Sequence, residues 1–454
     1  MLGFFKGLFN KLGVDGAIGY TLISRMLQAV SGIFTLLFVV KFLSTEEQGY
    51  FYTFGSIIAI QVFFELGITG IIVQYVAHEA SNFSWTSKSV FQGSEQSMSR
   101  MSSLLHFSIK WFSLIAVLLF FTLVLVGIVF FTRYGDLDNT VDWKMPWILL
   151  AFSTSVLLVL SPILAFLEGL GKVKEIARIR LIQQICQVLL TYLLFFLGYK
   201  LYAVPLASLI TCVIMIGVIY CDGLRIILVH SWKKLGLDRI NYKKEIFPYQ
   251  WKIALSWISG YFIFQLFNPV LFATEGATVA GQMGMTLAVL NAVFSLTFSW
   301  ISTKVPLFSS LIAKKEFTQL DTVFNKTLKL SALLNIFCLI IFFVLVFVLD
   351  YFKVTIAGKE FYNRFLPIVP LILMMIPIFT NHIVGAWATY LRCHKEEPML
   401  IQSVLMGILC SISTIVLGKI FGVVGITTGY MILSIGSLIW TYITFRKLKV
   451  LWHT

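Results

Sequence analysis

Two charged residues interrupt the long apolar runs at the start of the sequence, and their types and spacing could support binding chemistry. Arg25 lies within the run Ile18–Phe42, and Glu65 lies within the run Phe51–Val76. If both runs are helices that pass in opposite directions, Arg25 lies about 25 Å from the end of its run and Glu65 about 21 Å from the start of its own, at about 1.5 Å per residue. Opposite charges at similar depth can pair, and an arginine fork binds phosphate oxygens in pairs. Two interpretations stay open: an ion pair that only joins two helices, and an Arg25 that meets a phosphate group with Glu65 as its resting counter-ion.

Further polar residues lie within or beside the other apolar runs. His382 and Asn381 lie in Phe365–Tyr390, a run that also contains prolines. Histidine titrates near neutral pH, so a proton-coupled role and an ordinary hydrogen-bonded histidine are both open. Lys110 and Lys304 lie near the ends of runs, where they could extend toward water or line an entrance and bind phosphates. Amide side chains within the runs could bind sugar hydroxyl groups or join helices; these are Gln28, Gln61, Gln265, Asn268 and Asn291.

The composition defines the surroundings of these residues. Of the 454 residues, 58% are hydrophobic and only 12% are charged, whereas an ordinary soluble domain is about one quarter charged. No soluble fold has enough interior to bury so much apolar surface, so lipid must be the solvent for most of the chain. The net charge of +14 then reports orientation in a membrane rather than binding to nucleic acid, and we expect no nucleic-acid partner. The sequence predicts a polytopic membrane protein.

Twelve apolar runs are long enough to cross a bilayer core, which needs about 20 helical residues. They are Ile18–Phe42, Phe51–Val76, Leu104–Phe131, Pro146–Leu167, Ile179–Leu197, Leu201–Cys221, Trp251–Ala273, Gln282–Thr303, Leu330–Leu349, Phe365–Tyr390, Met399–Leu417 and Ile420–Phe445. Two tight junctions leave a count of ten or eleven open. The runs are continuous and lack the alternation of barrel strands, so we expect an all-α fold.

The basic residues indicate how these helices are oriented. With a cytoplasmic amino terminus, 26 of the 35 lysines and arginines fall in or beside inner segments and eight fall in outer segments. Cytoplasmic loops of membrane proteins show this bias. We therefore expect a multi-pass protein with both termini in the cytoplasm. No cleavage site of small residues follows the basic amino-terminal stretch, so we expect no removable signal peptide.

The longest polar stretch separates six runs from six runs. We expect an N-lobe at 1–221, a basic cytoplasmic linker at 222–250 and a C-lobe at 251–454. Six spans in each half make the halves parallel, and pseudo-symmetric parallel halves around a central cavity are one architecture of transporters. A duplicated scaffold without a transport role is the alternative. The linker carries basic residues with apolar residues between them, which favours anionic lipid headgroups; a solvated linker is equally open.

Short matches support the repeat. The outer loop that ends at Gly49 has a counterpart that ends at Gly281, and alignment of these two glycines places Thr297 at the position of Glu65. Leu181-Ile182-Gln183 also recurs as Leu400-Ile401-Gln402. Their common order along the chain indicates a duplicated unit.

Two segments carry a family resemblance. Thr21–Glu79 contains a first apolar run, a short acidic loop that ends at Gly49-Tyr50, and Glu65-Leu66-Gly67 in the second run. Ser256–Leu290 has the matching order at the start of the second half. These segments resemble the starts of the two lobes of a Wzx-type polysaccharide flippase of the multidrug/oligosaccharidyl-lipid/polysaccharide (MOP) superfamily, whose plan of two six-helix lobes agrees over the whole length.

The resemblance implies a MATE-like fold and transport by alternating access. It implies that the substrate is an oligosaccharide repeat unit on undecaprenyl pyrophosphate, flipped across the bacterial cytoplasmic (inner) membrane for O-antigen of lipopolysaccharide, capsule or exopolysaccharide. Arg25 would bind the pyrophosphate, and the other candidates for substrate binding are Glu65, Gln28, Lys110, Lys304, His382 and Asn381. The expected partners are this lipid-linked oligosaccharide, membrane lipids, a coupling ion (H⁺ or Na⁺) and other membrane proteins of polysaccharide assembly.

Two other functions remain open. An exporter of drugs or organic cations from the same superfamily would need acidic residues in its pathway, whereas the clear intramembrane charges here are one arginine and one glutamate. A membrane-embedded polysaccharide enzyme is less favoured, because such polymerases generally carry a long outer loop and the longest expected here have about 15 residues. The outer segments show no acid–base pair, metal-ligand cluster or nucleophile–base spacing. We therefore expect no catalytic residue, no metal and no cofactor.

Overall fold

Helices make up most of the structure, a computed structural model that describes residues 16–81, 83–87, 89–135, 141–234, 236, 238–356, 358–394 and 396–453. Contacts divide the chain into two compact units. The first contains the chain up to Thr35 together with Ile60–Arg133 and Asp142–Trp257. The second contains Leu36–Ala59, Tyr134–Val141 and the chain from Ile258 onward. The all-α membrane fold predicted from the apolar runs is confirmed.

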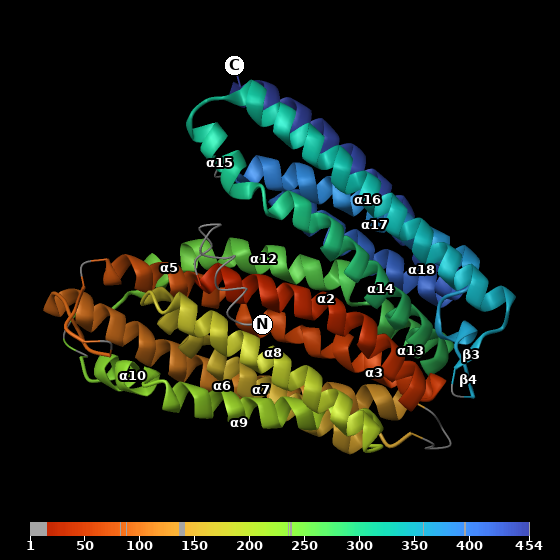
Figure 1. Ribbon diagram of the computed structural model, residues 1–454, viewed down its shortest axis with the longest axis horizontal. Helices are drawn as coiled ribbons and strands as arrows, with labels where there is room; N and C mark the ends of the chain where they lie inside the picture. Colours follow the sequence, from red (N-terminus) through yellow and green to blue (C-terminus); the bar gives the residue numbers. More distant parts are fainter. Residues whose placement is uncertain are drawn as a thin grey trace, which may run out of the picture. The chain divides into compact units, whose positions relative to one another are not determined.

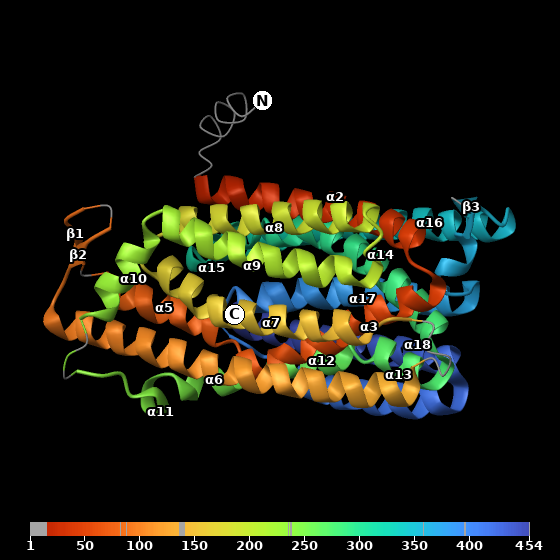
Figure 2. The same ribbon diagram turned by 90° about the horizontal axis from the view of Figure 1, so that it is seen from below.

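The first unit is a bundle of helices (Figure 1) with one short hairpin (Figure 2). Its elements are most of α2 (Gly16–Phe42), α4 (Val62–Glu65), α5 (Ile68–Ala80), β1 (Ser84–Trp85), β2 (Phe91–Gln92), α6 (Glu95–Tyr134), α7 (Lys144–Gly169), α8 (Val173–Phe196), η2 (Lys200–Tyr202), α9 (Ala203–Cys221), α10 (Leu224–Trp232), α11 (Tyr242–Glu245) and the start of α12 (Phe247–Phe264). Helix α7 packs against α5 and α9, and α8 packs against α9. The hairpin lies beside α10, where His230 Nε2 is 2.9 Å from the Phe91 carbonyl oxygen (Figure 2). The expected linker at 222–250 therefore packs largely as part of this unit.

The second unit joins α3 (Thr45–Ile58) to helices of the second half of the sequence. These are α13 (Phe267–Glu275), α14 (Ala277–Ser302), α15 (Val305–Ala313), α16 (Phe317–Tyr351), α17 (Ile368–Arg392) and α18 (Leu400–His453), with β3 (Thr355–Ile356), β4 (Lys359–Glu360) and η3 (Tyr362–Arg364). Helix α3 packs against α14 and α13, and α17 packs against α18. Division by contacts thus groups α3 with the second half of the chain. The lobe boundaries at 221 and 251 stay a prediction.

Nine helices of the described residues are long and apolar enough to cross a membrane, or ten when the bent pair Thr45–Glu65 and Ile68–Ala80 counts as one span. Each predicted span overlaps a helix. Helix α18 runs through 54 residues and contains one non-helical residue, Gly422, where two helices meet. The Val423 amide nitrogen there donates to Glu275 Oε1 at 2.6 Å, which caps the second of these helices. The count of twelve stays a prediction.

The predicted span Phe51–Val76 is not one unbroken helix but falls on a bent pair of helices. A 3₁₀ turn, η1 (Ala59–Gln61), follows α3, and α4 then ends at Glu65. Leu66 and Gly67 adopt the left-handed backbone conformation with φ of 50° and 67°, and the helices on either side are bent by 41°. Apolar composition does not reveal a break of this kind, because leucine and glycine are both compatible with a membrane helix.

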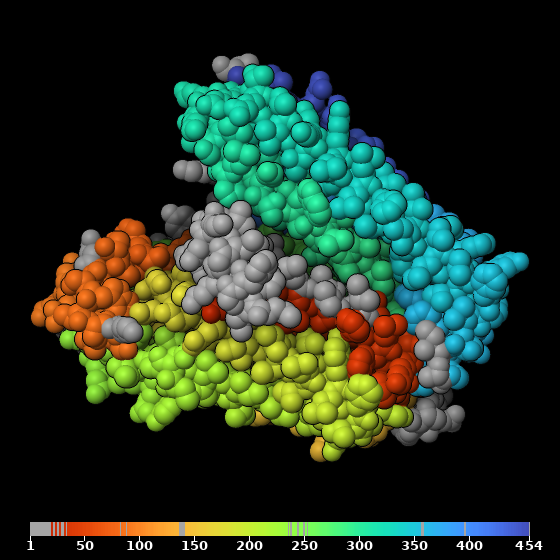
Figure 3. Space-filling view, in the orientation of Figure 1, coloured from red at the N-terminus to blue at the C-terminus, as the bar shows by residue number. Residues whose placement is uncertain are grey.

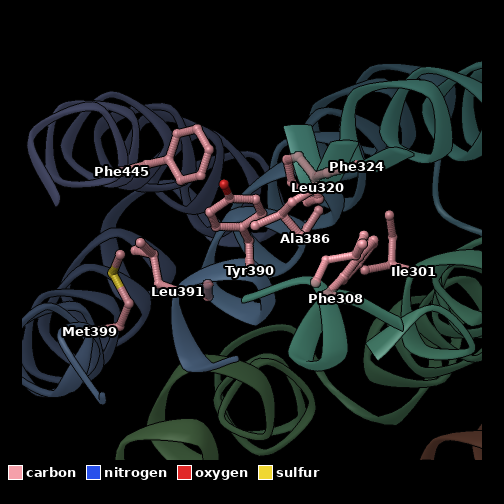
Figure 4. Close-up of a cluster of buried hydrophobic side chains, with 11 residues drawn as sticks. Ile301, Phe308, Leu320, Phe324, Ala386, Tyr390, Leu391, Met399 and Phe445 are labelled. Carbon is pink, nitrogen blue, oxygen red and sulfur yellow. The ribbon is translucent and has the colours of Figure 1, made fainter. Parts of the chain in front are cut away.

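Aromatic side chains form a core within the second unit (Figure 4). The Tyr390 ring of α17 lies 4.7 Å from the Phe324 ring of α16 and 5.2 Å from the Phe445 ring of α18, between centroids. Edge-to-face pairs of this kind contribute about 0.5–1.5 kcal/mol beyond the burial of their area. The Tyr390 hydroxyl donates to Asp321 Oδ1 at 2.8 Å, so its polar end is satisfied as well. This core holds α16, α17 and α18 together.

Apolar side chains cover the outer faces of the helices. On α8 and α9, Leu189, Leu193 and Val213 are 62%, 53% and 70% exposed. Side chains of these two helices gather on the face of the first unit that Figure 3 presents in yellow to yellow-green. Exposed apolar side chains of this kind are unfavourable in water and favourable in hydrocarbon. These faces are suited to contact with lipid.

Candidate functional site

Glu65, the charged residue of the second predicted span, lies where that span breaks. Leu66, directly after it, is a non-glycine residue with positive φ, a conformation that costs about 1–2 kcal/mol for a residue with a Cβ. Position 67 requires glycine, because a Cβ there would lie 2.6 Å from Ile253 Cγ2. Thr69 Oγ1 donates a hydrogen bond to Glu65 Oε1 at 2.9 Å. The break therefore presents the carboxylate at a helix end, and local strain of this kind is common at functional sites.

Glu65 lines a cavity of about 480 Å³ inside the first unit. Its polar lining comes from α4, α5, α7 and α8 and consists of Glu65, Thr69, Ser161, Glu168, Arg180 and Gln183. The remaining wall is mostly apolar and includes Leu160, Leu164 and Met215. Ligand sites commonly have about 300–1,000 Å³ and combine apolar walls with a few polar groups. This cavity, called the Glu65 cavity below, has both properties.

The Glu65 cavity contains one ion pair. Arg180 Nη2 lies 2.7 Å from Glu168 Oε2, and the two side chains are 54% and 24% exposed. An ion pair this accessible to water contributes about 0–1 kcal/mol to stability, so it leaves both groups available to a ligand. With Glu65, the lining holds two carboxylates and one guanidinium among the side chains that the structure describes. Its chemistry is suited to hydroxyl groups or to a cation.

Of the other predicted site residues, Gln28, Lys110 and Lys304 have described side chains, and none of the three lines this cavity. Arg25 lies in α2, and its side chain falls outside the described residues, so the Arg25–Glu65 pair stays a prediction. Gln28 of the same helix is exposed and is not part of the cavity lining. Lys110 of α6 lines a separate cavity of about 260 Å³. Lys304 is exposed at the junction of α14 and α15 in the second unit.

His382 belongs to a buried polar network in the second unit. Its side chain is 0% exposed, with Nε2 3.0 Å from Ser331 Oγ and Nδ1 3.4 Å from Thr297 Oγ1. Asn335 Nδ2 donates to the same Thr297 oxygen at 2.9 Å. Thr297 is the residue that the repeat alignment places at the position of Glu65. Of the two interpretations of His382, the geometry favours the hydrogen-bonded histidine, because both ring nitrogens have partners inside the protein.

Asn381 and the repeated glutamine also have defined partners. Asn381 Nδ2 donates to the Tyr430 hydroxyl at 2.9 Å, which joins α17 to α18. Gln402 is 5% exposed and donates to Ser437 and Thr441 of the same long helix region. Its counterpart in the repeated Leu-Ile-Gln segment, Gln183, lines the Glu65 cavity. The glutamine of the second copy, Gln402, therefore contributes to packing, whereas that of the first copy, Gln183, faces a cavity.

Sequence analysis did not single out Glu168, Arg180 or Gln183 as site residues. Arg180 counted only as a charge that indicates orientation, and Glu168 lies at the end of an apolar run. A signal was present, because Glu168 lies at the end of α7 and Arg180 lies in the first half of α8, on two helices joined by a short turn. Helix α8 forms a second ion pair through Arg178, with Asp222 at the end of α9.

Several solved structures with the same fold are membrane transporters. The chain is similar to an inward-facing multidrug resistance MATE family transporter of the MOP superfamily, with a TM-score of 0.62, 14% identity, and coverage of 94% of this chain and 95% of that one. It is similar to the lipid II flippase MurJ in an inward closed conformation, with a TM-score of 0.56, 14% identity, and coverage of 94% and 86%. It is also similar to the Vibrio cholerae MATE transporter VcmN in the bent form, with a TM-score of 0.55, 15% identity, and coverage of 96% and 98%.

No protein-family model matches the sequence, and no curated protein matches it either. At 14–15% identity, the structural similarity establishes the fold and leaves the substrate open. The chain therefore has the fold of the polytopic MATE and MOP-superfamily transporters.

Proposed function

We propose that this chain is a flippase that moves an oligosaccharide repeat unit linked to undecaprenyl pyrophosphate across the bacterial cytoplasmic membrane by alternating access. The observation that carries the proposal is the polar Glu65 cavity within a fold shared with MOP-superfamily transporters. One similar structure is a lipid II flippase, so this fold serves flippases as well as multidrug transporters. The order of features in Thr21–Glu79 favours the polysaccharide branch.

The lining of the Glu65 cavity suits a sugar. Sugar hydroxyl groups both donate and accept hydrogen bonds, and they need partners of both kinds. Glu65 and Glu168 accept, Arg180 donates, and the Gln183 amide does both. The apolar wall beside these groups suits the carbon–hydrogen faces of a sugar ring. Part of an oligosaccharide would fill this cavity while its lipid stays in the bilayer.

The pyrophosphate needs cationic partners, and we assign this role to Arg25 with Lys304 nearer the inner surface. Arginine suits the role because its planar fork donates two parallel hydrogen bonds to phosphate oxygens. Glu65 would act as the counter-ion of Arg25 between substrates. A coupling ion, H⁺ or Na⁺, would bind most readily at the carboxylates of Glu65 and Glu168, because His382 is already engaged in its buried network.

One observation favours a second function, the export of an organic cation. The described lining of the Glu65 cavity holds more carboxylate than guanidinium charge, which attracts cations. One similar structure is a multidrug resistance MATE family transporter, and another is the MATE transporter VcmN. The position of Arg25 would separate the two functions. If its guanidinium lies beside Glu65, it neutralises the excess negative charge of this cavity, and the cavity no longer attracts cations.

Deletion of the gene followed by lipid analysis distinguishes the two functions. A flippase predicts that the lipid-linked repeat unit accumulates in the inner leaflet, that surface polysaccharide is lost, and that drug sensitivity stays unchanged. An exporter predicts the reverse, normal lipids and increased sensitivity to cationic drugs. Normal lipids together with normal polysaccharide in the deleted strain would contradict the proposal.

Substitutions at Arg25 and Glu65 test the assigned roles. Arg25→Ala and Arg25→Glu should abolish export while the protein still reaches the membrane, and Arg25→Lys should be impaired because a point charge replaces a fork. Glu65→Gln should be mild, and exchange of the two charges should stay inactive. If the pair is only structural, each truncation lowers stability by about 3–5 kcal/mol and the exchange restores export. An active Arg25→Ala protein would remove Arg25 from the mechanism.

A further inference from the structure

A second cavity in the first unit gathers basic side chains without an acidic partner. It has a volume of about 260 Å³ and lies between α6 and the segment 239–246. Lys110 and Arg239 supply two positive charges, and His106 adds an imidazole. The residues that line it include no aspartate or glutamate, and the described side chains show no ion pair of Lys110 or Arg239. We call it the Lys110 cavity.

The absence of an acidic partner distinguishes this cavity from its neighbour on the same helix. Arg100 Nε lies 3.0 Å from Glu79 Oε1, and Arg100 Nη2 lies 2.5 Å from Glu245 Oε2. Arg100 is therefore neutralised by two carboxylates. Glu245 also accepts from the Tyr75 hydroxyl at 2.7 Å and the Asn241 amide at 3.0 Å, so both of its oxygens have partners. The charges of Lys110 and Arg239 remain available to an anion.

One face of α6 holds the wall of the cavity in place. Ser99 Oγ donates to the Asp238 carbonyl at 2.6 Å and accepts from the Gly236 amide at 2.8 Å. One turn further on, Ser103 Oγ accepts from the Ile240 amide at 3.0 Å. These bonds anchor the backbone on both sides of Arg239. Because residues three or four apart share a helix face, His106 and Lys110 continue the same face toward the cavity.

Most of the remaining lining is apolar or aromatic, and two tryptophans contact lining residues from outside the cavity. The Phe107 ring lies 4.9 Å from the Tyr242 ring and 6.0 Å from the Trp111 ring, between centroids. The His106 ring stacks on Trp232 at 3.5 Å. Trp111 and Trp232 are each 38% exposed. Tryptophan and tyrosine concentrate where hydrocarbon meets headgroups, so these rings place the cavity at headgroup depth.

We propose that the Lys110 cavity binds the phosphate group of an anionic membrane lipid, with Lys110 and Arg239 on the phosphate oxygens and an acyl chain along Phe107 and Trp111. Basic pockets beside membrane helices bind anionic headgroups through this combination of charge and apolar wall. This site is separate from the Glu65 cavity and does not depend on the proposed transport substrate. Sequence analysis expected only that the basic linker favours anionic lipid. The proposal assigns this binding to Lys110 and Arg239 in one cavity.

Lipid binding to the purified full-length chain tests the proposal. The ligands are phosphatidylglycerol, which carries one negative charge, phosphatidylcholine with the same acyl chains, and inorganic phosphate. Native mass spectrometry counts the bound lipid, and thermal unfolding in a neutral detergent yields an apparent Kd. The double substitution Lys110→Gln with Arg239→Gln should weaken phosphatidylglycerol binding by about tenfold or more, since each basic residue near a surface contributes about 1 kcal/mol.

The matched control is Lys233→Gln with Lys234→Gln, which removes the same charge from exposed positions of the same linker outside the cavity. It should change the apparent Kd by at most about twofold. The conservative double variant, Lys110→Arg with Arg239→Lys, should keep the wild-type affinity and checks that a loss reflects charge rather than folding. Equal binding of phosphatidylcholine, equal binding of inorganic phosphate, or an equal loss in the control would each overturn the proposal.

Discussion

Gly281 of α14 lies directly against Gly49 of α3: a Cβ atom at position 281 would fall 2.9 Å from the Gly49 amide nitrogen. In the other direction, a Cβ on Gly49 would fall 2.0 Å from the Ala277 carbonyl oxygen. No side chain fits between the two backbones, so both positions need glycine. These are also the two glycines that the sequence repeat aligns with each other. Equivalent positions of the two halves therefore meet within the second unit.

Substitution of Gly49 should separate α3 from α14. Gly49→Ala forces the added methyl group against backbone rather than against a flexible side chain, and we expect a loss of about 1–3 kcal/mol in the free energy of unfolding. Thermal unfolding of the purified protein in detergent measures this loss as a lower midpoint temperature.

Gly55 of the same helix provides the control. A Cβ at Gly55 would meet no atom within 4 Å, so Gly55→Ala should be neutral or should stabilise the helix by up to about 1 kcal/mol. Equal midpoint temperatures for Gly49→Ala and Gly55→Ala would show that the close approach of the backbones at Gly49 does not contribute to stability.

Arg364 binds the end of α2 and the start of α3, close in sequence to Gly49. Its side chain is 2% exposed and donates to the carbonyl oxygens of Leu43 and Ser44, both at 2.9 Å, and to Gln48 Oε1 at 3.0 Å. A cation at a helix carboxyl terminus satisfies carbonyl groups that have no partner within the helix. Burial lowers the pKa of the Arg364 guanidinium, and nearby carboxylates including Glu46 oppose this effect.

Arg364→Gln should destabilise the second unit strongly. The change leaves buried carbonyl groups unpaired, and bonds to a charged donor contribute about 1.5–3 kcal/mol each, so we expect a loss of about 3 kcal/mol or more. Urea-dependent or thermal unfolding in detergent is the measurement. Arg392→Gln, which breaks an exposed pair with Glu397 at 2.9 Å, should cost less than about 1 kcal/mol. If both variants unfold alike, the buried contacts of Arg364 are not stabilising.

His382→Ala should show how much the buried hydrogen-bond network around Thr297 contributes to stability. The substitution leaves Ser331 and Thr297 without their ring partner and opens space beside Phe298, so we expect a loss of about 2–4 kcal/mol. Stability in detergent is compared with that of His78→Ala, whose side chain is exposed. A stable His382→Ala protein with altered pH dependence of transport would instead support a proton-coupled role.

His394 should make stability depend on pH. It lies after α17, stacked 4.7 Å from Trp452, with Nε2 3.3 Å from His453 Nε2. Burial lowers the pKa of His394 below its ordinary value of 6.5. The unfolded chain therefore takes up the proton first as pH falls. The contribution of neutral His394 to the free energy of unfolding is complete above about pH 6.5. It decreases as the pH falls from there towards the pKa of His394 in the folded state.

The midpoint of thermal unfolding should thus decrease between about pH 7.5 and about pH 5, and His394→Gln should reduce this decrease. His453, Asp321 and Lys449 face the same cluster and stay unchanged in the variant. An identical pH profile for wild type and His394→Gln would exclude His394 as the responsible group.

The sequence alone determined the class of protein and the positions of its helices. A run of about 20 apolar residues has the length of a bilayer core, and this relation depends only on local composition. For the same reason the sequence pointed to Glu65 and His382, because a titratable residue in an apolar run must find a partner or a function. The break after Glu65 escaped this reasoning, since Leu66 and Gly67 do not change the apolar character of the run.

Only the tertiary structure decided which residues meet. Glu168 and Arg180 join Glu65 in one cavity lining, whereas sequence analysis had counted Arg180 only as a charge that indicates orientation. Arg364 lies between two predicted spans, and only the structure shows that it is buried against Leu43, which lies 321 positions earlier in the chain. Gly49 and Gly281 come together in the same way. Contacts across such separations depend on how helices pack and on which polar groups burial leaves unpaired, and the apolar pattern of a single run carries no information about either.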